Sequence, residues 1–268
     1  MIGSSRADEP GTSEEGSATL STSPVAAYAL ALGDDALILG QRLIEWVTHA
    51  PELEEEVALA NISLDLLGQA RTLLTYAGSF DGRDEDALAY RRAPEQFRCV
   101  HLVERPNGDF GATVARQLLF SAYQFELYDA LTASADPTLA GLAGKAVKEV
   151  AYHRDHASLW TLRLGDGTKV SRGRMQDGLA AMWPYADELF APDPATAGLV
   201  GLGAAVDPAA LRPAWTRYVE SVLAEATLTV PQMTPAPGGG RSGIHTPEFG
   251  ALLEEMTSLH LEHPGAQW

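Results

Sequence analysis

One segment of this sequence has a regular spacing of apolar residues that few folds can use. Apolar side chains recur at intervals close to four and three at Leu53, Val57, Ala60, Leu64, Leu67 and Leu74. These intervals place side chains on one face of an α-helix, because a helix completes a turn in about 3.6 residues. The spacing therefore predicts a long helix that packs in a bundle through this seam.

Three further segments are long, rich in helix-favouring residues and bounded by helix-ending signals. They are residues 24–50, 110–135 and 137–164. Pro51 ends the first segment, and only a tight turn separates the last two, which predicts antiparallel neighbours. A connection over 78–109, with one or two short helices, separates the two helix pairs. Two pairs joined by one long crossover are typical of the ferritin-like four-helix bundle.

The C-terminal part of the chain predicts additional helices around that bundle. They lie within 171–191, 207–228 and 246–268, with N-cap candidates in Ser171, Asp207 and Thr246. Residues 234–245 are rich in glycine and proline and predict a flexible loop. No alternating run is long enough to predict a strand. The sequence therefore predicts an all-α protein, a ferritin-like four-helix bundle with additional C-terminal helices.

The N-terminal segment differs in composition from the rest of the chain. Residues 1–23 contain almost no large apolar side chains and many acidic, serine, glycine and threonine residues. Such a segment cannot offset its ordering entropy by burial. It also lacks the basic and then apolar stretches of a signal peptide. We predict a disordered acidic tail over 1–23 and a single ferritin-like helical domain over 24–268.

The charge of the chain restricts its partners. Asp and Glu total 36 against 19 Lys and Arg, a net charge of −17, so long-range repulsion opposes nucleic acid and anionic lipid. No apolar run approaches the roughly 18 residues that indicate a membrane span. The single cysteine, Cys99, cannot form an intramolecular disulfide, which fits a reducing compartment. We therefore expect a cytoplasmic protein without nucleic-acid or membrane partners.

Acidic residues and a histidine on the four long helices raise the question of a metal centre. The candidates are Glu45, Asp65, Glu126, Glu149 and His153. Di-iron carboxylate bundles use a Glu with a His three residues later on two of their helices. Here the third residue after Asp65 is Gly68, and the third after Glu149 is Tyr152. Because a carboxylate cluster without imidazoles is a poor iron site, we predict a degenerate site without metal.

A structural role is the commoner alternative for polar residues of this kind. Carboxylates and amides such as Asp34, Gln41 and Gln69 can pair with basic residues and set the register of packed helices. A hydrogen-bonded helix histidine is likewise commoner than a ligand, which applies to His153 and His156. The residues alone leave two interpretations: structural polar networks, or an active di-iron oxygenase or ferroxidase that uses the five candidates.

Several long strings of this sequence resemble one family. They are LGDDALILGQRLIEWVTHAPELEEEVALANISLDLLGQARTLLTYA, EQFRCVHLVERPNGDFGATVARQ, KEVAYHRDHASLWTLRLGDGT and the ending PGAQW. Together they resemble the C subunits (PaaC) of the phenylacetyl-CoA epoxidases, also called ring 1,2-phenylacetyl-CoA oxygenases. The resemblance runs from about Ala27 to the C-terminus and excludes the acidic tail.

The resemblance implies a ferritin-like subunit of a multicomponent monooxygenase in aerobic phenylacetate degradation. In that family, the catalytic A subunit holds the di-iron centre and the substrate, the C subunit lacks the metal ligands, and a reductase supplies electrons from NADPH. We therefore expect a noncatalytic structural subunit without a cofactor of its own. Its expected partners are the catalytic A subunit and the other subunits, including the reductase. The hypothesis also allows a homo-oligomer, formed through the surface that would otherwise contact the A subunit.

Overall fold

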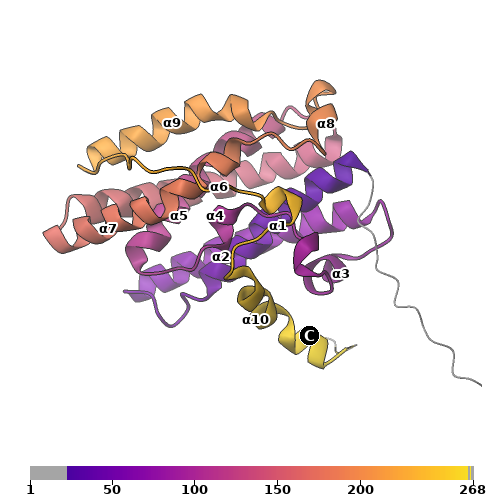
Figure 1. Cartoon of the computed structure of the whole chain (residues 1–268), viewed down its shortest axis with the longest axis horizontal. Coiled ribbons are helices and arrows are strands. Elements are labelled where there is room, and N and C mark those ends of the chain that lie inside the picture. The colour runs from indigo at the N-terminus through magenta and orange to yellow at the C-terminus, as the bar shows by residue number, and fades with distance from the viewer. Residues whose placement is uncertain (1–22, 265, 267–268) are drawn as a thin grey trace, which may run out of the picture.

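The structure, a computed structural model, describes residues 23–264 and 266, and every regular element within them is a helix (Figure 1). The four long helices are α1 (Pro24–Ile44), α2 (Leu53–Gly78), α5 (Phe110–Leu131) and α6 (Pro137–Gly165). Helix α1 packs mainly against α2, and α5 packs mainly against α6. The predicted all-α, ferritin-like bundle is confirmed. Residues 1–22 of the predicted tail lie outside the described part of the chain.

Shorter helices pack around the four-helix bundle. They are α3 (Glu85–Tyr90), α4 (His101–Glu104), α7 (Lys169–Met182), α8 (Ala197–Gly201), α9 (Pro208–Glu225) and α10 (Phe249–Glu262). Four single 3₁₀ turns lie at Pro94–Gln96, Trp183–Tyr185, Asp187–Phe190 and Gly240–Ser242. Helices α7 and α9 pack on α5, whereas α4 and α8 pack on α1. Within the described residues, no helix is long and apolar enough to cross a membrane.

The ends of the helices follow their capping residues. The Asp136 side chain accepts from the backbone N–H groups of Thr138 and Leu139, and Pro137 occupies the first turn, so α6 starts where the sequence predicts. Asp207 caps α9 in the same way, as predicted. Two predicted caps are wrong. Thr168 caps α7 and Ser171 is the third residue of a capping box, while α10 begins after Glu248.

The first long helix is shorter than the sequence predicts. It ends at Ile44, because Thr48 adopts a φ of 75°, which a right-handed helix cannot accommodate. The indole N–H of Trp46 donates to Thr113 Oγ1 at 2.9 Å, and this bond ties the residues after the helix to α5. The chain therefore leaves α1 before the turn that leads into α2.

The predicted seam of α2 is wrong. Leu53, Val57 and Leu64 are exposed by 72%, 53% and 61%, and Leu67 is also exposed. The side chains that pack into the bundle are instead Leu59, Ile62, Leu66, Ala70 and Leu73, together with Leu74 of the predicted set. Helix α2 thus has two apolar stripes, and residue spacing cannot tell which of them faces the core.

Two neighbouring carboxylates in α1 hold distant parts of the chain against the bundle. Asp34 is fully buried and binds both terminal nitrogens of Arg92, from the crossover that joins α2 to α5, with Nη1 at 2.9 Å. Asp35 accepts from Nη1 and Nη2 of Arg241 at 3.0 and 2.6 Å. The backbone N–H of Arg98 also donates to Asp34, and the backbone N–H of Val100 donates to Asp35. Their burial therefore requires both distant segments to be in place.

Residues 229–248, which we call the strap, run across the bundle from α9 to α10. Glu188 accepts from the backbone N–H groups of Gly239 and Gly240, and a Cβ on Gly240 would overlap the carbonyl oxygen of Cys99. The sequence predicts a flexible loop over 234–245, and the structure agrees in that no long helix forms there. Its flexibility is contradicted, because side chains far away in the sequence anchor its backbone.

We expect Arg241→Ala to lower the free energy of unfolding by about 3–5 kcal/mol, because the change leaves the Asp35 carboxylate buried without its cation. Arg71→Ala is the matched control. Arg71 pairs with Glu85, but 76% of its side chain is exposed, so its loss should cost less than about 1 kcal/mol. Urea unfolding monitored by circular dichroism measures both changes. Equal losses in the two variants would contradict the role given to Asp35.

Candidate functional site

Helices α2 and α6 run antiparallel and share a row of polar contacts that contains three of the five metal-ligand candidates. Nε2 of His153 lies 3.1 Å from Oδ2 of Asp65. His153 is only 1% exposed, and burial lowers the pKa of its imidazole, although the Asp65 carboxylate opposes that shift. The two candidates are thus brought together, and each is the partner of the other.

Glu149 lies one helical turn before His153 and also has protein partners. Its Oε2 accepts from Nε2 of Gln69 at 3.0 Å, and its Oε1 lies 3.3 Å from Nζ of Lys145. Farther along the same row, His156 Nε2 and Glu55 Oε2 are 2.8 Å apart. These contacts join α2 to α6 at successive turns, which is the structural role that polar residues in packed helices often have.

The other two candidates lie elsewhere. Glu45 follows the last residue of α1, where Oε1 accepts from Arg42 and Oε2 accepts from Asn107, each at 3.0 Å. Glu126 lies on α5 at 3.8 Å from Arg154 Nη1, and burial raises the pKa of its carboxyl group. Neither belongs to the row between α2 and α6.

The five candidates do not fit a di-iron centre. Such a centre needs donors from all four helices to converge at one level of the bundle, whereas here they form three separate groups, each with its own partners. The positions that lack histidines also face outward. Tyr152 is exposed, and a Cβ on Gly68 would meet no atom within 4 Å. Leu66 and Val150, which directly follow Asp65 and Glu149 in the chain, are buried but apolar.

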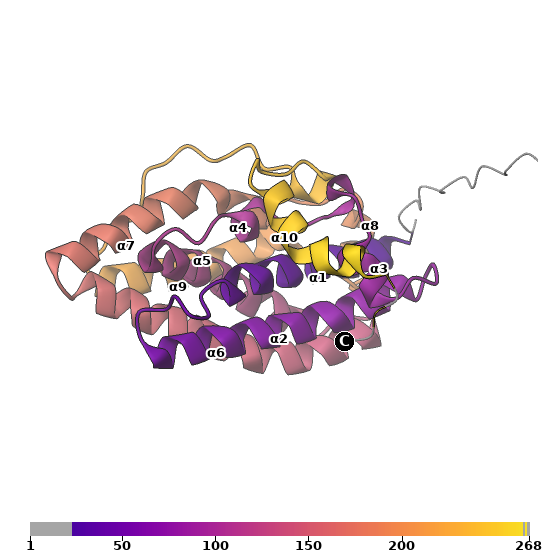
Figure 2. The ribbon, with the colours of Figure 1, turned by 90° about the horizontal axis from the view of Figure 1, so that it is seen from below.

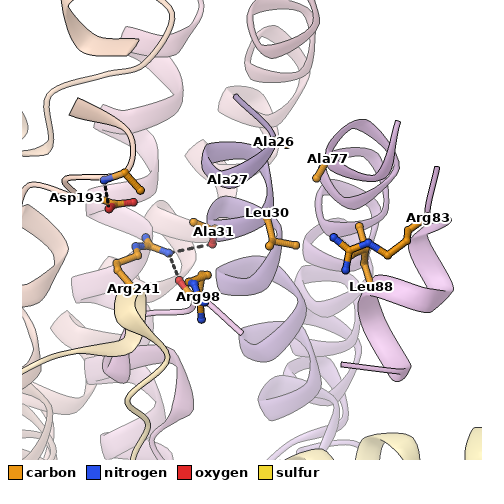
Figure 3. A pocket seen from close by; sticks show the side chains of 11 residues that line it. Ala26, Ala27, Leu30, Ala31, Ala77, Arg83, Leu88, Arg98, Asp193 and Arg241 are labelled. Carbon is orange, nitrogen blue, oxygen red and sulfur yellow. Dashed lines mark hydrogen bonds between the residues drawn. The ribbon is translucent and has the colours of Figure 1, made fainter. Parts of the chain in front are cut away.

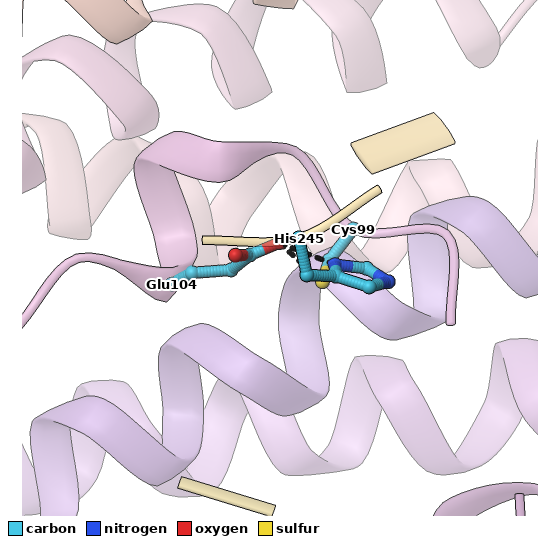
Figure 4. Close-up of side chains that lie close together, drawn as sticks. All are labelled: Cys99, Glu104 and His245. Carbon is cyan, nitrogen blue, oxygen red and sulfur yellow. Dashed lines mark hydrogen bonds and ion pairs between the residues drawn. The ribbon is translucent and has the colours of Figure 1, made fainter. Parts of the chain in front are cut away.

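A second polar cluster lies where the strap meets α4, and no motif in the sequence indicates it, because its members come from distant segments (Figure 4). Oε1 of Glu104 lies 2.7 Å from Nδ1 of His245 and accepts from the thiol of Cys99 at 3.5 Å. Its Oε2 accepts from the backbone N–H of Thr246. His245 stacks on Phe249 with ring centroids 4.1 Å apart. The cluster thus fastens the strap where α10 begins.

The chemistry available to this cluster is limited by its burial. Within the described residues, Cys99, Glu104 and His245 are the one group of three potential metal ligands with all ligand atoms within 4.8 Å of one another. Burial, and then the adjacent Glu104 carboxylate, raise the pKa of the Cys99 thiol well above its ordinary value. A thiol held in its protonated form is a poor nucleophile and a poor metal ligand. Glu104 moreover already accepts from both neighbours.

A small pocket opens beside the N-terminal half of α1 (Figure 3). Its volume is about 60 Å³, enough for about two water molecules. Ala27 and Leu30 contribute apolar walls, and Arg241 lies at one side. The guanidinium group is already bound to Asp35 and to the carbonyl oxygens of Ala31 and Arg98. The pocket therefore offers space but no free catalytic group at Arg241.

The environment of His153 makes stability depend on pH. Because its folded pKa lies below the ordinary value of 6.5, the unfolded chain takes up a proton below about pH 6.5 that the folded chain does not. Above that pH, His153 therefore does not affect how the free energy of unfolding changes with pH. Below it, His153 lowers the free energy of unfolding as the pH falls. We expect His153→Gln to lose less stability than the wild type between pH 7 and pH 5. Urea unfolding at both pH values measures this difference.

His49→Gln is the control for this experiment, because His49 is exposed near the end of α1. Its pH dependence should match that of the wild type. If His153→Gln follows the wild-type pH dependence as closely as the control does, burial of a neutral His153 does not contribute to acid sensitivity.

Comparisons with known proteins agree with this architecture. A family described as "Phenylacetic acid catabolic protein" matches residues 11–268. The C subunit of the 1,2-phenylacetyl-CoA epoxidase of Escherichia coli strain K12 is 48% identical over 243 residues, which cover 90% of this chain and 98% of that relative. The family match covers all four long helices, the crossover and the strap. The chain belongs to the phenylacetic acid catabolic protein family.

Proposed function

We propose that this chain is a noncatalytic structural subunit of a phenylacetyl-CoA epoxidase in phenylacetate catabolism. The near full-length similarity to the C subunit of such an enzyme supports the assignment. The observation that carries the noncatalytic role is the pairing of the candidate ligands with one another and with Gln69, Lys145 and Arg154. In this proposal the reaction takes place in a separate catalytic subunit, which holds the di-iron centre.

The contribution of this chain is mechanical in the proposal. The ion pairs of Asp34 and Asp35 and the polar row between α2 and α6 make a bundle that keeps its shape when a partner docks. A stable hetero-oligomer usually buries more than about 2,000 Å² in total, and rigid helical surfaces lose little entropy when they form such an interface. The remaining partners in the proposal are further subunits, including an NADPH-dependent reductase, in a cytoplasmic assembly.

Omission of this chain is the first experiment. We expect the chain to co-elute with the catalytic subunit on size exclusion, and the isolated catalytic subunit to lose most epoxidase activity. Purified from medium that contains iron, this chain should hold far less than one iron ion per molecule. Near-stoichiometric pairs of iron in this chain would instead support an oxygenase or ferroxidase in its own right. Full activity without the chain would refute the structural role.

The second experiment replaces Glu149 by Gln in the reconstituted complex. The change keeps the shape of the side chain and removes its charge, so turnover should stay within a few-fold of the wild type. Stability of the subunit should change by about 1 kcal/mol in either direction, as for other paired polar groups. Glu52→Gln, at an exposed position before α2, is the matched control. His153→Ala is measured beside them.

A metal ligand would respond differently to these changes. The loss of one donor typically removes the bound metal together with most of the activity. If Glu149→Gln or His153→Ala strips iron from this chain and abolishes turnover while circular dichroism shows an intact fold, the noncatalytic assignment is wrong.

A further inference from the structure

An apolar groove lies between α1, α2 and α3. Its volume is about 330 Å³, within the range of roughly 300–1,000 Å³ that is usual for pockets that hold small organic groups. At one side of the groove, Leu67 is 37% exposed. The floor is made by buried side chains, namely Leu37, Ala70, Leu74 and Ala89. The groove therefore presents an apolar surface that solvent reaches.

The rim of the groove is polar and has charges of both signs. Arg71 Nε donates to Glu85 Oε1 at 3.1 Å, and Asp86 lines the same groove. An aromatic ring has a negative face and a positive edge, so a cation favours its face and carboxylates favour its edge. An indole also brings one N–H donor, for which the two carboxylates are acceptors. The groove thus suits a tryptophan side chain better than an aliphatic one.

Helix α10 ends beside this groove. Its last turns run next to α3 (Figure 2). The ring of His260 stacks on that of Tyr90 with centroids 4.8 Å apart, and its Nε2 accepts from Nε of Arg91 at 3.3 Å. Tyr90 is also one of the residues that line the groove. The residues that follow α10 therefore start at the groove itself.

Those following residues contain one large apolar side chain. After Leu261, the chain continues with Glu262 and then HPGAQW, in which only Trp268 is of this kind. Trp268 follows His260 by eight residues, which span at most about 28 Å when extended. Helix α3, which forms one wall of the groove, has six residues and is only about 9 Å long. The groove is therefore within reach of the indole.

We propose that the side chain of Trp268 binds in the groove between α1, α2 and α3. Burying a tryptophan removes about 150–250 Å² from water. A short tether also gives the indole an effective concentration of about a millimolar, so an interaction too weak for a free peptide is enough here. In this position the indole covers Leu67 and holds the end of α10 on α3. The inference concerns the chain by itself and does not depend on the proposed function.

Fluorine NMR of the full chain labelled with 5-fluorotryptophan tests the proposal. The chain has five tryptophans, and Trp268→Phe identifies the resonance of Trp268. We expect this resonance to lie apart from that of free 5-fluorotryptophan. Leu67→Glu puts a charge into the groove and should return the resonance to the free position. Val170→Glu is the matched control, because Val170 is 65% exposed but lies on α7, and it should leave the resonance unchanged.

Two results of this experiment would overturn the proposal. One is a wild-type resonance at the position of free 5-fluorotryptophan. The other is a displaced resonance that Leu67→Glu leaves in place, because the indole would then be bound somewhere else. Circular dichroism shows that each variant remains folded.

A designed disulfide tests the location independently. Asp86→Cys and Gln267→Cys put thiols at the rim of the groove and beside Trp268, and the native Cys99 is buried and does not compete. Mild oxidation should close this disulfide within one chain about tenfold faster than in the same double variant with Trp268→Ala, because the indole keeps the two thiols together. Non-reducing electrophoresis and peptide mapping measure the rates and the product.

Equal rates with and without the indole contradict the proposal. A disulfide-linked dimer as the main product contradicts it as well, because the groove would then hold the C-terminal residues of a second copy.

Discussion

The arrangement of the whole chain depends on two adjacent carboxylates buried in the first helix. Asp34 and Asp35 are 0% and 2% exposed, and a carboxylate in such a place is costly unless a cation reaches it. Arg92 comes from the crossover and Arg241 from the strap. Each arginine therefore compensates a charge that the bundle cannot satisfy by itself, and in doing so it ties its own segment to α1.

The same principle explains the polar row between α2 and α6. Side chains with metal-ligand chemistry are present, but Asp65 binds His153, and Glu149 is shared by Gln69 and Lys145. A group of this kind can join helices without any ion, because its donors and acceptors already match. The family membership and this pairing are the two observations on which the proposal of a noncatalytic subunit rests.

Several features follow from local rules and could be predicted. Helix starts at Pro137 and Pro208 were correct because Asp136 and Asp207 cap them through bonds within three residues. The sequence by itself shows that Gly68 and Tyr152 stand where histidines would follow Asp65 and Glu149 in a di-iron bundle. The end of the first helix and the cap of α7 were not predicted, because they depend on the backbone of Thr48 and on a choice between Thr168 and Ser171.

Periodicity and helix breakers, which act between residues close together in the chain, were enough to establish the helical class, the two helix pairs and their long crossover. The stripe of α2 that faces inward could be found only in the folded chain, because both stripes obey the same helical period and the choice depends on what α1 presents to them. The bond between Glu104 and His245 and the anchoring of the strap by Arg241 are of the same kind. Those contacts join residues more than 140 positions apart, and only burial in the folded chain makes them favourable.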